Sequence, residues 1–111
     1  MARLCLIASV LLGAQVLLGC GATVGDPCTV PDDCNGQLCI TRGETPGGYC
    51  SQQCVAGNDD SCPSGSTCVR GAAGDDLHAC FLRCNDVSDC RNGYACRTHR
   101  DSAFTVCVGP D

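Results

Sequence analysis

The spacing of its cysteines constrains this chain more than any other feature. Of the 14 cysteines, 12 fall into three sets of four between Cys28 and Cys107, and equivalent members of successive sets lie 26 to 30 residues apart. Other residues repeat with them: Asp33 and Asp89 each precede the second cysteine of their set, and a glycine follows that cysteine in every set. Self-similarity at a fixed period of this length is the signature of a repeat array. The sequence therefore predicts three tandem repeats, over residues 28–50, 54–80 and 84–107.

Apolar side chains are too few to build a conventional core. From Cys20 to the end, only 13 of 92 residues are Leu, Ile, Val or Phe, a level at which chains do not normally fold on hydrophobic burial alone. Cysteine is as common as these four together, which is typical of a cross-linked scaffold in an oxidising compartment. We therefore expect a small disulfide-rich fold, and we do not expect a conventional enzyme domain, a transcription factor or a multi-span membrane protein.

Each repeat also carries the pattern of a short β-hairpin. Between the second and third cysteines, Asn35-Gly36 and Asn92-Gly93 are strong turn formers because both residue types tolerate positive φ. The strands of the hairpin are expected after this turn. No stretch after the leader shows sustained helical periodicity, so we expect little or no helix outside the signal peptide. The expected strand pairs are Leu38–Arg42 with Gly48–Ser51, Thr67–Arg70 with Leu77–Leu82, and Tyr94–Thr98 with Ala103–Val108.

The N-terminus has the layout of a secretory signal peptide over residues 1–19. A positive start with Arg3 precedes an apolar run over Leu4–Leu18, and small residues follow. Leu17-Leu18-Gly19-Cys20 resembles the lipobox of bacterial lipoproteins, in which a peptidase cuts before a cysteine that carries diacylglycerol. This resemblance implies that Cys20 is the lipidated N-terminus and that the protein is anchored at the outer membrane or cell surface. Residues 20–27 would then tether the repeats to the lipid. The small residues of Gly21–Gly25 favour a flexible tether.

Two other readings of the leader remain open. Cleavage after Ala22 would release a soluble secreted protein, and the uncharged stretch Leu4–Gly25 is long enough to span a bilayer uncleaved. Removal of Cys5 with the leader and lipidation of Cys20 leave 12 cysteines, an even number, and cleavage after Ala22 leaves the same 12. Cysteine parity therefore argues against the uncleaved span and does not separate the other two.

The repeats resemble known extracellular cysteine-rich modules over 25 to 30 residues per copy. The spacing C-x7-C-x5-C-x11-C of the middle set is similar to the first four cysteines of an EGF-like module, and Cys84–Cys96 is similar to the start of Dickkopf N-terminal and EB-type modules. Four cysteines allow three pairings. The EGF resemblance implies bonds from first to third and from second to fourth: Cys28–Cys39, Cys34–Cys50, Cys54–Cys68, Cys62–Cys80, Cys84–Cys96 and Cys90–Cys107.

Metal-binding patterns are weak. The cysteines lack the C-x2-C and C-x-C spacings of thiolate sites, so we expect no thiolate-bound metal, no thioredoxin-type redox role and no cofactor. Paired carboxylates at Asp32-Asp33, Asp59-Asp60 and Asp75-Asp76, with Asp86 and Asp89, are oxygen ligands suited to calcium. No EF-hand-type loop contains them, and solvated turn residues are the simpler interpretation.

Catalytic and nucleic-acid-binding signals are also weak. His78 and His99 have no nucleophile motif beside them, and we expect both to be exposed hairpin residues. We expect Tyr49 and Tyr94 to pack over the disulfides. With 12 acidic residues and six arginines from Cys20 onward, the net charge is −6, which disfavours a nucleic-acid partner.

Three functional classes follow. The preferred one is a non-catalytic cell-envelope lipoprotein whose repeat array is a rigid stalk or interaction module for a protein or glycan ligand. The alternative is a secreted inhibitor or effector that presents Arg42, Arg70 or Arg100 as a bait residue. An enzyme is the third class, and it would need a pocket with convergent titratable groups.

Overall fold

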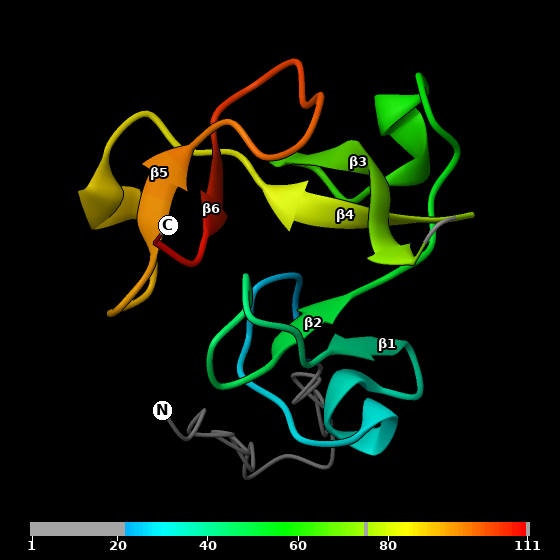
Figure 1. The fold of residues 1–111 in the computed structure, drawn as a ribbon. Coiled ribbons are helices and arrows are strands. Elements are labelled where there is room, and N and C mark those ends of the chain that lie inside the picture. The colour runs from blue at the N-terminus through cyan, green and yellow to red at the C-terminus, as the bar shows by residue number, and fades with distance from the viewer. Residues whose placement is uncertain (1–21, 75, 111) are drawn as a thin grey trace, which may run out of the picture.

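The structure, a computed structural model, describes residues 22–74 and 76–110. Within them the chain forms three antiparallel two-stranded hairpins and three short 3-10 helices, with no longer helix. In chain order the elements are η1 (Pro31–Cys34), β1 (Leu38–Ile40), β2 (Tyr49–Ser51), η2 (Asp59–Ser61), β3 (Ser66–Gly74), β4 (Leu77–Leu82), η3 (Val87–Asp89), β5 (Ala95–Arg97) and β6 (Val106–Val108). The prediction of a small disulfide-rich fold with one hairpin per repeat is confirmed (Figure 1).

The loop between the first two cysteines is built in the same way in every repeat. The side chain just before the second cysteine accepts a hydrogen bond from the backbone N–H just after the first. The oxygen–nitrogen distances are 2.9 Å for Asp33 and Thr29, 2.9 Å for Ser61 and Val55, and 2.8 Å for Asp89 and Asn85. A short polar side chain that bonds a nearby backbone N–H is the usual way to close such a turn. The repeated Asp of the sequence is therefore a turn-closing residue.

The turn that follows depends on glycine. Gly36, Gly65 and Gly93 all have φ between 78° and 87°, a region that costs other residues free energy. Asn35 also has positive φ, at 57°, as the Asn-Gly pattern predicts. Asn92 does not, because the turn that joins the Arg91 carbonyl to the Tyr94 N–H needs positive φ at its glycine alone.

In each repeat, two disulfides run from the hairpin to the loop before it, and none joins the two strands to each other. The third and fourth cysteines of each repeat lie directly opposite each other, as Cys39 does Cys50. Each bonds elsewhere: the third to the first, and the fourth to the second. The pairs are Cys28–Cys39, Cys34–Cys50, Cys54–Cys68, Cys62–Cys80, Cys84–Cys96 and Cys90–Cys107. Both strands of every hairpin are thereby attached to the loop that precedes them.

The segment before the first cysteine of each repeat forms a third, irregular strand. In the first repeat the Cys50 N–H donates to the Asp26 carbonyl and the Gly25 N–H donates to the Cys50 carbonyl, both at 2.8 Å. The equivalent bond in the second repeat joins the Cys80 N–H to the Gln52 carbonyl, and in the third repeat Arg83 forms a β-bridge with Val106. The flexible tether expected over residues 20–27 is therefore absent from its described part, residues 22–27, where Val24 is buried in the core with 8% of its surface exposed.

A run of four aromatic rings, three of them stacked and one tilted, joins the three repeats. Tyr49 of the first repeat lies between Phe81 of the second, with ring centroids 4.6 Å apart, and Tyr94 of the third, at 5.9 Å. His99 of the third repeat packs against the other side of this run, with its ring centroid 5.4 Å from that of Phe81. Tyr49 is 1% exposed, and its hydroxyl accepts a hydrogen bond from the Leu82 N–H at 2.9 Å. Tyr49 and Tyr94 thus pack mainly against other aromatic rings.

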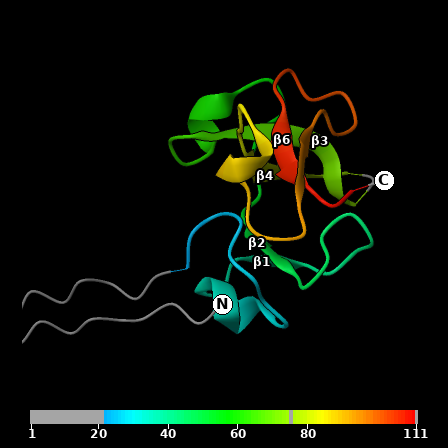
Figure 2. The ribbon, with the colours of Figure 1, turned by 90° about the vertical axis from the view of Figure 1, so that its left-hand side faces the viewer.

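Arg91 fastens the third repeat to the first. Its guanidinium donates to the carbonyls of Gly25, Pro46 and Gly48 at 2.9, 2.6 and 2.5 Å, and lies 4.3 Å from the centroid of the Tyr94 ring. Since the third repeat contacts both others, the array closes on itself around a shared core and does not extend as a stalk (Figures 1 and 2).

Replacement of Tyr49 tests the ring stack. Tyr49→Phe keeps the stack but removes the partner of the partly buried Leu82 N–H, and should cost about 1–3 kcal/mol of unfolding free energy. Tyr49→Ala also opens a cavity and should cost about 3–5 kcal/mol. Val55→Ala, at a side chain 61% exposed, is the matched control and should stay within about 0.5 kcal/mol. Equal stability of all three variants in urea denaturation would contradict the packing described.

The disulfide pairing predicts a specific peptide map. Digestion without reduction should release peptides that join Cys28 to Cys39 and Cys34 to Cys50, with the equivalent pairs in the other repeats. Mass spectrometry before and after reduction identifies them. A peptide in which Cys39 is bonded to Cys50 would show that the strands are cross-linked to each other and would overturn this topology.

Candidate functional site

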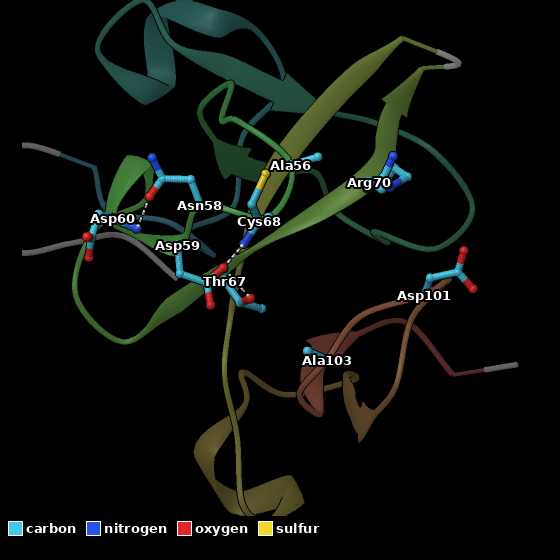
Figure 3. A pocket seen from close by; sticks show the side chains of 10 residues that line it. Ala56, Asn58, Asp59, Asp60, Thr67, Cys68, Arg70, Asp101 and Ala103 are labelled. Carbon is cyan, nitrogen blue, oxygen red and sulfur yellow. Dashed lines mark hydrogen bonds between the residues drawn. The ribbon is translucent and has the colours of Figure 1, made fainter.

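A polar groove lies between the second and third repeats (Figure 3). It has a volume of about 510 Å³ and opens to solvent. Its walls are η2 and the start of β3 on one side, and the loop before β6 on the other. The lining residues are Ala56, Gly57, Asn58, Asp59, Asp60, Thr67, Cys68, Arg70, Asp101 and Ala103.

Asp59 holds the repeat 2 wall in place. One carboxylate oxygen accepts hydrogen bonds from the Thr67 hydroxyl at 2.8 Å and from the Cys68 N–H at 3.1 Å, and the other pairs with Arg83 at 2.8 Å. The Cys68 N–H, the Thr67 hydroxyl and then Arg83 hold the pKa of Asp59 below its usual value, against a smaller effect of burial. Asp59 is thus committed to structure, and we do not count it as a group free to contact a ligand.

The repeat 3 wall is a tight loop over residues 99–103. The Ser102 hydroxyl accepts from the His99 N–H at 3.0 Å and donates to the Phe104 carbonyl at 2.8 Å, and Arg100 has a φ of 54°. The Arg83 guanidinium that pairs with Asp59 also lies 3.8 Å from the centroid of the Phe104 ring. Because one side chain contacts both walls, it holds the two sides of the groove together.

The groove is lined by both negatively and positively charged side chains. Asp60, Arg70 and Asp101 are exposed, with Asp60 at one side and Arg70 and Asp101 at the other (Figure 3). The lining has no histidine, and its one cysteine is in a disulfide. These groups suit contact with a polar ligand surface, for which exposed charges at the rim of an interface give orientation.

The other paired carboxylates lie outside this groove. Asp33 and Asp89 close the loops of the first and third repeats, and the N–H groups of Thr29 and Val30 with the Thr29 hydroxyl lower the pKa of Asp33. Asp75 lies outside the described residues. Among the described residues, the only sets of three metal-ligating side chains close enough to share an ion are cysteines. Within that part of the chain, no cluster of carboxylates supports the calcium interpretation.

The clustered cysteines are already bonded to one another. Three sulfurs in each repeat lie within 4.8 Å of one another: those of Cys28, Cys34 and Cys50, of Cys54, Cys62 and Cys68, and of Cys84, Cys90 and Cys107. Every cysteine in the described residues belongs to a disulfide, so these sulfurs are not thiolates. Cys5 and Cys20, including the expected lipidation site, lie outside the described residues.

The two histidines are not the exposed residues that the sequence predicts. His78 is half-buried, and its Nδ1 accepts a hydrogen bond from the Gly71 N–H at 2.9 Å. His99 is only 7% exposed because its ring packs on Phe81 at the junction of the repeats. Burial lowers the pKa of His99 below its usual value; Glu44 opposes this effect, whereas Arg97 and Arg100 add to it. The burial of His99 could not be predicted from its sequence neighbours, because it depends on Phe81 of another repeat.

The arginines proposed as bait residues occupy three different settings. Arg42 donates to the Ala73 carbonyl at 3.4 Å, Arg70 lies within β3, and Arg100 has left-handed backbone geometry. A peptide read in extended form needs β-region backbone, which Arg100 does not have. Of the three arginines, only Arg70 lines the groove.

Comparisons of the chain with protein-family models, with curated proteins and with solved structures found no significant match. Among the residues that the structure describes, no helix is long and apolar enough to cross a bilayer.

The buried His99 predicts how stability depends on pH. Since its pKa is lowered in the folded state, the unfolded chain binds more protons below pH ~6.5, and stability should fall as the pH drops through and below that value. His99→Gln should flatten this slope between about pH 5.5 and 7.5 in urea denaturation. An NMR titration that placed the pKa of His99 at or above that of a free imidazole would contradict the burial.

Proposed function

We propose that the protein is a non-catalytic cell-envelope lipoprotein, anchored through Cys20, whose closed repeat array is an interaction module. The leader supports this proposal through its apolar run and the Leu17-Leu18-Gly19-Cys20 sequence. Six disulfides in so short a chain are typical of an exported protein.

The observation that carries the anchor is the Leu17-Leu18-Gly19-Cys20 sequence, and the disulfides of the body, which fit cleavage after Ala22 equally well, agree with it. All 12 cysteines from Cys28 to Cys107 are in disulfides, and Cys5 lies within the expected signal peptide. Cys20 then has no partner left in the mature chain. A lone reactive thiol at the start of an exported chain is a liability unless it is modified, and thioether linkage to a lipid removes it.

The groove supports a role for the repeat array in binding a ligand rather than in catalysing a reaction. Its exposed groups are carboxylates and one guanidinium, held on walls that Asp59 and Arg83 fix in place. A preorganised surface of this kind binds a ligand with little loss of conformational entropy. We therefore assign the protein or glycan ligand of the proposed module to this groove, with Asp60, Arg70 and Asp101 as contact residues.

Metabolic labelling with a radioactive fatty acid tests the anchor. The native chain, expressed in a double-membrane bacterium, should incorporate label and fractionate with membranes, because the diacylglycerol stays on Cys20. Cys20→Ala should lose the label. Cys5→Ala, which removes the other cysteine outside the repeats, is the matched control and should retain it. Label-free native protein in the medium, with its N-terminus at Thr23, would identify the soluble secreted form instead.

A further inference from the structure

The residues just after the proposed lipidation site are part of the folded body. Ala22 packs against the cluster of Cys28, Cys34 and Cys50. Val24 is buried in the main core, and Gly25 and Asp26 bond the backbone of β2. The body therefore includes residue 22, six residues before the first cysteine of the repeats.

This leaves very little chain between the body and a lipid on Cys20. Gly21 is the only residue between Cys20 and Ala22. Two Cα–Cα steps of about 3.8 Å each limit the Cα separation of Cys20 and Ala22 to roughly 7 Å. A free tether over Gly21–Asp26, as the sequence predicts, would reach about 20 Å.

We infer that the body lies directly against the lipid surface with the first repeat toward it, an inference that rests on the proposed anchor at Cys20. The contacting surface is the loop from Thr29 to Asp32, which lies between Cys28 and Cys34, two of the three cysteines in the cluster that Ala22 packs against. Val30 in this loop is 49% exposed, and Pro31 beside it is exposed and uncharged. These two side chains suit insertion among zwitterionic headgroups.

Charge determines the kind of bilayer that fits. Asp32 and Asp33 lie in η1, directly after Val30 and Pro31 in the chain, and Asp26 accepts a hydrogen bond from the Thr23 N–H at 2.9 Å. An acidic face is repelled by anionic headgroups, so the short anchor and the apolar pair, and not electrostatic attraction, hold this end down. The surface therefore fits a neutral or zwitterionic leaflet better than an anionic one.

The same placement turns the groove outward. Figures 1 and 2, which share a vertical axis, place η2 at the opposite end of the molecule from η1. Since η2 forms one wall of the groove, the groove is presented away from the bilayer. The array thus reaches outward through its second repeat without needing a stalk.

Paramagnetic broadening tests this orientation. The lipoprotein is placed in zwitterionic nanodiscs that contain a gadolinium-chelating lipid, and its backbone amide signals are recorded. Signals of Val30–Asn35 should broaden several-fold more than those of Asn58–Cys62. A Gly-Ser spacer of about ten residues between Gly21 and Ala22, with a root-mean-square length of roughly 18 Å, should remove most of this contrast without altering the fold. Equal broadening at both ends in the native chain would overturn the inference.

A second sample separates this inference from the anchor itself. The chain from residue 20 onward is coupled to a maleimide lipid through Cys20, whose thiol is free when the other 12 cysteines are in disulfides. The same contrast in this sample, together with no fatty-acid label in cells, would mean that the anchor proposal is wrong while the attachment geometry holds. Uniform broadening in the coupled sample, with label present in cells, would mean that the anchor exists and the body does not lie against the bilayer.

Discussion

The crossing of two disulfides over one hairpin is the constraint on which the rest of the structure depends. Cys39 and Cys50 face each other across the strands, yet each is bonded to a cysteine of the preceding loop, Cys28 or Cys34. Three separate segments are thereby held together with very few apolar side chains. Such bonds stabilise a fold largely by restricting the unfolded chain, by about 2–4 kcal/mol each. The same crossing recurs in all three repeats, which is why one spacing rule describes the whole chain.

Contacts between repeats rest on different chemistry. Tyr49, Phe81 and Tyr94 supply most of the aromatic surface, and burying rings of this size stabilises a small core more than any other apolar contact available here. Arg91 adds three charge-assisted hydrogen bonds to carbonyls of the first repeat. Disulfides thus define each unit, and the rings and one guanidinium join the units. This division explains how a chain with so few apolar residues forms one body, on whose rigidity both the groove and the inferred orientation depend.

Local features could be predicted from the sequence, and contacts between repeats could not. Cysteine spacing predicts the repeats, and the Asn-Gly pairs predict the turn before the first strand of a hairpin, because both patterns act over a few residues. The ring stack uses non-equivalent positions: Tyr49 precedes a fourth cysteine, Phe81 follows one, and Tyr94 lies before a third. Because these positions differ between the repeats, the repeat pattern does not indicate that the three rings meet. Small residues in Gly21–Gly25 suggest flexibility, but the burial of Val24 depends on a core formed by distant segments. His99 and the groove likewise arise only where two repeats meet.

The most direct test of this account is circular dichroism of the purified protein with and without a reductant at neutral pH. Oxidised protein should show a near-ultraviolet signal from the ordered Tyr49 and Phe81 rings, and a far-ultraviolet spectrum of short strands. Reduction should abolish both, because neither the hairpins nor the ring stack is stable without the cross-links. Retention of the near-ultraviolet signal after complete reduction would show that packing alone specifies the fold, and would contradict the central claim.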